Sequence, residues 1–429
     1  MLSYEEFIAK VTELPKIDTH EHITTNKYSI NSNLDIFDLM FMPYNCDSLL
    51  SAGCSIDEWI QICNKSLSFD DRFKTVEKYL VLIRNITFFK AVTITLKELY
   101  GLKEYTLEEC KRVDKLIKEE VKGNHYDHYF KKNNIEAVLT FIDYDSVELF
   151  DEAPVYPVPT VSNMVPRNKV TLEKLEKLSG VKIRNISNLD KAMELIVDLY
   201  CSLGVKALKF GSAYHRKLDF DTNDRQAASG ILNKVMSTPL RGDEKLLGLP
   251  VETLSWEEAR SLDDYMTHYL INLATDRDLT VVFHIGIHAW NENLVESCHA
   301  TYLNKTIMMH KEARIVLLHG GIPYIEDAIL LARYYPNVYI DMTWMHIISP
   351  SLTRKAVERY LELLPVNKIV AFGGDYCYIQ NIYGNLEIAI SNICKVFYGE
   401  ITDENFTEEE ALRIIKMWFY DNPKKIYKL

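Results

Sequence analysis

Short apolar runs recur along the chain, and a longer amphipathic stretch follows each of them. A short apolar run predicts a buried strand, and apolar residues at helical spacing predict a helix that packs on it. This alternation is typical of βα units arranged around a parallel sheet. Eight strands are predicted in this way, over residues 16–19, 137–142, 156–160, 205–210, 280–283, 314–318, 337–340 and 368–372.

Two long segments interrupt the alternation. Residues 25–132, after the first strand, carry apolar residues at helical spacing, and we expect them to form a helical insertion over the barrel mouth. Residues 221–278 also have a helical pattern, which includes 226–228 and 256–260, with a loop around 241–243. Binding specificity on barrels resides in segments over the rim, so the first insertion is expected to shape the pocket as a lid.

Near the carboxyl terminus, Thr407 and Glu410 have the spacing of a capping box. This pattern predicts a helix over residues 411–420, which Asn422 and Pro423 then end.

Length and composition agree with one large domain. The chain has 429 residues, of which 47% are hydrophobic and 26% charged, which is enough apolar material for a large core. A closed barrel with insertions reaches this length around one core. We therefore predict an α/β fold, a (β/α)8 TIM barrel that forms a single domain over residues 1–429 with a helical insertion after strand one.

Charge and cysteine content exclude several classes of protein. The net charge is −12 and no basic stripe exists, so we expect no nucleic-acid partner. The amino terminus lacks a secretory signal, and no apolar run is long enough to span a bilayer, so we expect a cytoplasmic protein without membrane contact. The eight cysteines form no CxxC pair, which argues against a zinc knuckle or a disulfide scaffold.

Polar residues fall where the predicted strands end. His20 and His22 follow the first strand, His284 ends the fifth, His319 follows the sixth, and Asp375 follows the eighth. The carboxyl ends of barrel strands form one small rim, which is where barrel enzymes have their active sites. We therefore expect these five side chains to converge.

The residue types suit a divalent metal ion. His20 and His22 are two positions apart, so their side chains point to the same side of a strand, and Glu21 faces elsewhere. Imidazole nitrogens with one carboxylate are ligands for Zn²⁺, our first expectation, and also for Mn²⁺ or Fe²⁺. Such an ion lowers the pKa of a bound water to about 7, and Asp375 could act as its general base.

At these motifs the chain resembles the amidohydrolase superfamily, and more closely its amidohydrolase-2 branch. The resemblance implies a barrel with His20, His22, His284 and Asp375 as metal ligands and His319 as the group that polarises substrate or water. Relatives with two metals use a carboxylated lysine or a glutamate on strand four, where Lys209 lies; we expect one metal. The matching segments are residues 17–22, 283–286, 316–324, 335–341 and 372–375.

Further candidates lie after strands four and seven. Lys209 and Arg216 at a barrel mouth would suit a substrate carboxylate, since arginine can bind it with two hydrogen bonds. Lys209 could equally pair with an acidic residue, and His215 and Arg216 could belong to a solvated loop. The residues predicted to bind substrate are Lys209, Tyr214, His215, Arg216 and Trp344.

These observations favour a metal-dependent hydrolase that attacks a C–N or C–O bond of a small carboxylated substrate with metal-activated water. The long helical segment also resembles uronate isomerases, so sugar-acid isomerisation is an alternative, with Arg216 on the uronate carboxylate. Non-oxidative decarboxylation and a non-catalytic binding barrel are further alternatives. The chain could form a homo-oligomer, because members of the resembled family often self-associate.

Overall fold

The computed structural model contains eight parallel strands in one sheet and a separate two-stranded hairpin. The strand order, β1-β2-β3-β4-β7-β8-β9-β10, follows the chain, as in a (β/α)8 barrel, and confirms the eight strands predicted from the sequence. The hairpin of β5 (Lys245–Leu246) and β6 (Leu249–Pro250) was not predicted. The structure describes residues 2–24, 33–122, 126–147, 154–238, 245–246, 249–250, 254–290 and 293–429.

The chain divides into two compact units, each of which contains strands of the sheet. The first unit comprises residues 1–140, 289–292 and 342–422, and the second comprises residues 141–288, 293–341 and 423–429.

The first unit holds the two ends of the sheet. Strand β1 (Lys16–Glu21) is buried along its whole length and pairs in parallel with β2 (Ile135–Asp143), for example Ile17 with Ala137. Outside the helical insertion, this unit also contains α1 (Tyr4–Thr12), α16 (Met345–Ile348), α17 (Pro350–Leu363), β10 (Ile369–Val370), α18 (Ile379–Thr402) and α19 (Glu408–Lys416).

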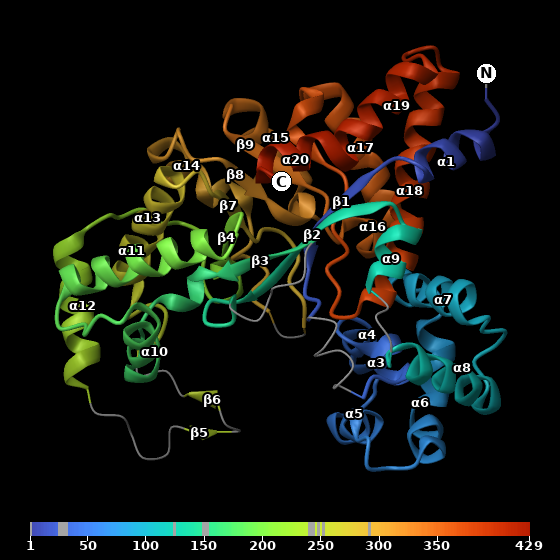
Figure 1. The fold of residues 1–429 in the computed structure, drawn as a ribbon, viewed down its shortest axis with the longest axis horizontal. Coiled ribbons are helices and arrows are strands. Elements are labelled where there is room, and N and C mark those ends of the chain that lie inside the picture. Colours follow the sequence, from blue (N-terminus) through green and yellow to red (C-terminus); the bar gives the residue numbers. More distant parts are fainter. Residues whose placement is uncertain are drawn as a thin grey trace. The chain divides into compact units, whose positions relative to one another are not determined.

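The predicted helical insertion is present in this unit. Figure 1 shows α3 to α8, in blue and cyan, gathered together, and α7 packs along α18. The insertion has its own core, in which Phe41, Val76, Leu96 and Val113 are fully buried. The helices are α3 (Ile36–Phe41), α4 (Asn45–Ser51), α5 (Ile56–Cys63), α6 (Phe69–Ile83), α7 (Thr87–Tyr100), α8 (Leu107–Glu120) and α9 (Tyr126–Lys132).

The second unit holds the middle of the sheet. Strand β4 pairs in parallel with β7, and β7 with β8, so that Lys209 lies beside Val282. These strands are short and fully buried, as expected of a parallel sheet covered by helices. The elements are β3 (Val155–Thr160), α10 (Lys169–Ser179), α11 (Ile186–Ser202), β4 (Ala207–Phe210), α12 (Arg225–Ser237), α13 (Arg260–Asp276), β7 (Thr280–Phe283), α14 (Asn304–Met309), β8 (Ile315–Leu317), α15 (Ile325–Tyr334) and β9 (Val338–Asp341).

Three local predictions need correction or a limit. Residues 256–259 form a turn and α13 begins only at Arg260, so the helical pattern there was misread. The capping box of Thr407 and Glu410 is present, but Pro423 lies in the first turn of α20 (Asn422–Tyr427) instead of ending the chain's helices, because proline is well tolerated at a helix start. The loop predicted around residues 241–243 lies outside the described residues.

Within the described ranges, no single helix is long and apolar enough to cross a membrane. The bent pair of α6 and α7, with an angle of 116° between the helices, meets the criteria of length and composition only when the two are taken together.

Candidate metal centre

Two histidines and one aspartate come together in the first unit. His20 Nε2 lies 3.3 Å and His22 Nε2 lies 3.2 Å from Asp375 Oδ1, so one carboxylate oxygen faces both imidazoles. Ligand atoms of the three residues all lie within 4.8 Å of one another, as a shared metal ion requires. The side chains of His20 and Asp375 are buried, whereas that of His22 is 43% exposed. The group is therefore open on the side of His22.

Backbone hydrogen bonds hold the aspartate beside the strand. The N–H of Asp375 donates to the carbonyl of His20 (2.7 Å), and the N–H of His22 donates to the carbonyl of Tyr376 (2.8 Å). Asp375 adopts a left-handed conformation with φ of 62°, which is uncommon for a residue with a side chain. Burial raises the pKa of Asp375, but His20 and His22 outweigh burial and hold its pKa well below the usual range.

The two glycines before Asp375 explain how the loop comes so close. A Cβ on Gly373 would lie 2.1 Å from Thr343 Oγ1, and a Cβ on Gly374 would lie 1.8 Å from Glu21 Oε1. Only glycine lets this loop reach strand β1. The Phe-Gly-Gly-Asp segment that the sequence singled out is therefore a requirement of close packing as well as a source of a ligand.

Two carboxylates of β1 accept hydrogen bonds from the backbone of the loop that carries Asp375. Asp18 Oδ1 accepts from the N–H of Gly374 (3.2 Å), and Glu21 Oε2 accepts from the N–H of Tyr376 (2.7 Å). Burial, together with the neighbouring Asp18, raises the pKa of Glu21 well above its usual value. Asp18 and Glu21 therefore both bind the loop that carries Asp375.

The insertion also contacts Asp375, which the sequence did not reveal. The Tyr44 hydroxyl donates to the carbonyl of Asp375. The Tyr44 ring packs on Trp344 (centroids 4.5 Å apart) and on Phe88 (5.3 Å). Trp344, predicted to bind substrate, is 3% exposed and lies in this aromatic group. No sequence signal identifies Tyr44, because its role depends on a tertiary contact across 331 residues.

A histidine group occupies the second unit. His319 Nε2 lies 3.0 Å from His284 Nδ1, and His284 Nε2 lies 3.0 Å from the carbonyl of Ile287. The ring of Tyr214 packs on His284 (4.6 Å) and on His288 (4.7 Å), and the rings of His284 and His288 are stacked. His319, with φ of 60°, precedes two glycines with positive φ.

Lys209 is also in the second unit, on β4. Its side chain is buried, and Nζ lies 4.9 Å from the centroid of the Phe141 ring. Its predicted contact with substrate and its carboxylation both stay predictions.

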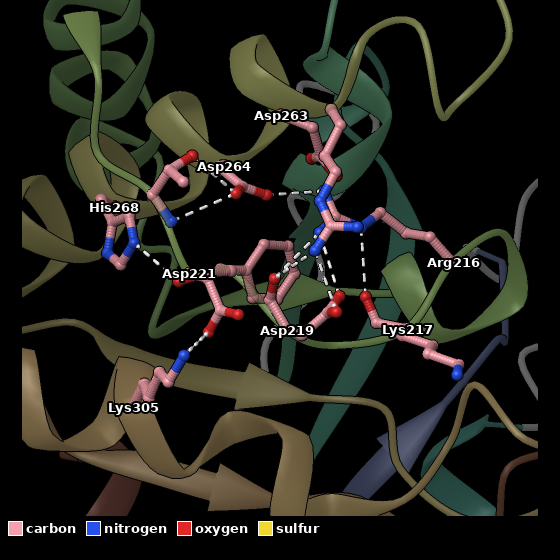
Figure 2. Close-up of polar contacts among 11 residues, drawn as sticks. Arg216, Lys217, Asp219, Asp221, Asp263, Asp264, His268 and Lys305 are labelled. Carbon is pink, nitrogen blue, oxygen red and sulfur yellow. Dashed lines mark hydrogen bonds and ion pairs between the residues drawn. The ribbon is translucent and has the colours of Figure 1, made fainter.

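Arg216 does not fit the predicted role of a substrate clamp. Figure 2 shows its guanidinium surrounded by carboxylates: Nη1 donates to Asp263 (2.9 Å) and Asp264 (2.7 Å), and Nη2 donates to the carbonyl and to Oδ1 of Asp219. Nε donates to the carbonyl of Lys217. All five N–H donors of the side chain are thus engaged, which leaves none for a substrate carboxylate.

The alternative reading of a solvated loop is also wrong for Arg216, whose side chain is 9% exposed. His215, its neighbour, stacks on the ring of Trp256 with centroids 4.7 Å apart.

The structure thus brings seven of the predicted site residues together in two groups, one in each unit, and Lys209, His215 and Arg216 lie outside both groups. The first contains His20, His22, Asp375 and Trp344, and the second contains His284, His319 and Tyr214. Which of them bind metal or substrate stays a prediction.

Comparisons with known proteins agree with the fold. A family model described as Amidohydrolase matches residues 240–429. Protein fluG from Emericella nidulans is 24% identical over 271 residues, a match that covers 62% of this chain and 30% of that protein. The chain therefore corresponds to less than a third of the length of this relative.

Two solved structures resemble nearly the whole chain. Uronate isomerase from Thermotoga maritima has a TM-score of 0.79 at 15% identity and covers 99% of this chain and 97% of that one. Glucuronate isomerase from Caulobacter crescentus has a TM-score of 0.77 at 17% identity, with coverage of 99% and 93%. At these identities the likeness concerns the fold, and it confirms the barrel.

Proposed function

We propose that this protein is a metal-dependent hydrolase, on the premise that a family model described as Amidohydrolase matches residues 240–429. Its substrate would be a small carboxylated molecule in which water cleaves a C–N or C–O bond. The observation that carries the proposal is the group of His20, His22 and Asp375, whose ligand atoms converge within 4.8 Å. A group of this kind is the minimum that a catalytic metal needs.

The donor set fits a divalent transition metal. Two imidazole nitrogens and one carboxylate oxygen are ligands of Zn²⁺, Mn²⁺ and Fe²⁺, and Zn²⁺ is our first choice. When bound, such an ion polarises a carbonyl and makes hydroxide available from water near neutral pH. The exposed face of His22 gives the substrate a route to this group. His284 is the proposed fourth ligand.

The chain's own residues would orient the reaction and move its protons. Asp375 is held by its backbone N–H and by the Tyr44 hydroxyl, so its carboxylate has a fixed direction. A carboxylate within hydrogen-bond reach of a water can accept a proton from it and return the proton to the leaving group. His319 would donate a hydrogen bond to the carbonyl that is attacked.

Metal content and turnover of three variants test this assignment. We expect His20→Ala to lose most of the bound metal measured by elemental analysis, because it removes a buried ligand. Asp375→Asn should lose turnover even at saturating metal, since an amide cannot accept the proton. His128→Ala, an exposed histidine on α9, is the matched control and should behave like the parent. Full metal content and turnover in His20→Ala would refute the proposal.

Sugar-acid isomerisation is the second candidate. It is supported by the similarity of nearly the whole chain to two isomerases of uronates. The ion-paired state of Arg216 weakens it, because that residue was the proposed uronate partner.

A screen by mass spectrometry separates the candidates. Metal-loaded protein is incubated with pooled acyl-amino acids, lactones, uronates and aromatic acids. Gain of water indicates hydrolysis, an unchanged mass with a new retention time indicates isomerisation, and loss of CO₂ indicates decarboxylation. A chain that turns over none of them and contains substoichiometric metal would be a binding barrel.

A further inference from the structure

The helical insertion contains a cavity of about 650 Å³ that the proposed function does not use. One wall is a single face of α7, formed by Lys90, Thr93, Ile94 and Lys97, which follow one another at helical spacing. The end of α6 at Arg84 and the segment from Leu102 to Thr106 form the other walls. Its volume is in the range of small-molecule sites, about 300 to 1,000 Å³.

Four exposed cations line this cavity. Arg84, Lys90, Lys97 and Lys103 make no ion pair with any described residue, and Glu104 is the one acidic residue in the lining. Several other cations of the same insertion are paired, for instance Lys65 with Asp38, Lys78 with Glu58, and Lys111 with Asp70. The lining thus carries four cations and one carboxylate in a chain with a net charge of −12.

The floor of the cavity is aromatic and rigid. Tyr105 packs on the buried Phe89 with ring centroids 5.0 Å apart. Thr93 Oγ1 donates to the carbonyl of Phe89 (2.8 Å), so it must accept the hydrogen bond from the Tyr105 hydroxyl, also 2.8 Å long. Both rings are therefore fixed before any ligand arrives, which lowers the entropy cost of binding.

The cations that line the cavity come from three segments. Arg84 ends α6, Lys90 and Lys97 lie on α7, and Lys103 lies in the segment before α8. The amino end of α8 adds no free positive charge, because the Thr106 side chain accepts from the N–H of Glu109, and Glu108 and Glu109 lie in its first turn.

We propose that this cavity, here called the basic cavity, binds a small organic anion with two or more negative charges and a flat ring. Phosphate or carboxylate groups would pair with the cations, and the ring would pack on Tyr105. This site is independent of the candidate metal centre, and its test does not require turnover.

The test is a calorimetric titration of the full-length, metal-loaded chain with inorganic phosphate, pyrophosphate, citrate and ADP. We expect one ADP or pyrophosphate to bind per chain, more tightly than phosphate. The double variant K90Q/K97Q should bind about tenfold or more weakly, since two ion pairs are lost. The matched control, K74Q/K115Q, removes two exposed lysines of α6 and α8 that do not line the cavity, and should bind like the parent.

Two further measurements keep the outcome clear. All four lysines are exposed, so both double variants should fold. Circular dichroism melts check that they do. Tyr105→Leu keeps the charges but removes the aromatic floor, so ADP should bind more weakly, while the binding of pyrophosphate and citrate changes little. Equal binding by the two double variants, or anions that never saturate, would overturn the proposal. Binding at the metal centre would survive in K90Q/K97Q and would therefore count against it.

Discussion

Arg216 allows a sharp test of the structure, because its predicted role in substrate binding and its observed environment give opposite results. Replacing it by methionine removes five hydrogen bonds and leaves Asp263 and Asp264, both with side chains of zero exposure, without their cation. Breaking a buried ion pair by removing one partner costs about 3–5 kcal/mol. We expect Arg216→Met to lose about that much of the free energy of unfolding at neutral pH.

The loss should depend on pH in a defined direction. Burial raises the pKa of Asp263 to about 6, even though Arg216 lowers it. Without Arg216 the pKa rises further, so the folded protein binds a proton that the unfolded chain, with a pKa near 3.9, has released. Stability is then lost as pH rises from about 4 through the folded pKa. The deficit of Arg216→Met should therefore be larger at pH 8 than at pH 5.

Urea unfolding followed by circular dichroism at the two pH values measures this deficit. Lys217→Met is the matched control, because Lys217 is the adjacent cation and its side chain is 49% exposed; we expect a change below about 0.5 kcal/mol. Adding Asp264→Asn to Arg216→Met should restore part of the stability by removing one unpaired buried charge. A deficit under about 1 kcal/mol, or one equal at both pH values, would refute the reasoning. A raised KM at full stability would return Arg216 to substrate binding.

Three further predictions concern the first unit. Gly374→Ala places a Cβ 1.8 Å from Glu21 Oε1, so we expect a loss of about 1–3 kcal/mol in urea unfolding and weaker metal binding, and an unchanged melt would contradict the packing argument. Tyr44→Phe removes the hydrogen bond to the Asp375 carbonyl and should lower the free energy of unfolding by about 1 kcal/mol. Turnover, expressed as an activation free energy, should change by more than this, and kinetics and melts on one preparation measure both. Burial lowers the pKa of His346 to about 4, so its protonation favours the unfolded chain and stability is lost as pH falls from 6.5 to 4. The fall in stability from pH 7.5 to pH 5 should be smaller in His346→Gln, which keeps a donor for the Ala371 carbonyl. An identical fall in both proteins would show that His346 does not titrate in this range.

The sequence was sufficient to predict the eight strands of the barrel, because the apolar runs are short, buried and separated by long helical stretches. It was also sufficient to predict that His20, His22 and Asp375 lie together, since strand ends of a barrel share one rim. It could not identify Tyr44 as a neighbour of Asp375, because helix patterns do not show which residue of an insertion turns toward the sheet.

Arg216 was misjudged for a related reason. A cation next to Tyr214 and His215 resembles a ligand for a substrate carboxylate, and its true partners, Asp263 and Asp264, lie 47 and 48 residues later in the chain. Spacing along the sequence carries no information about such pairs. The turn at residues 256–259 was misread because its composition is compatible with a helix, although the chain adopts helical structure only from Arg260 onward.

The contact between Tyr44 and Asp375 has a consequence for protein engineering. Barrel loops are often regarded as modules that can be exchanged to alter specificity while the reactive groups stay as they were. Here a chimera that received residues 25–132 from another barrel would also lose a hydrogen bond to the backbone of the aspartate itself. Any graft of this insertion should therefore retain a tyrosine at the equivalent position, or its effects on chemistry and on recognition will be inseparable.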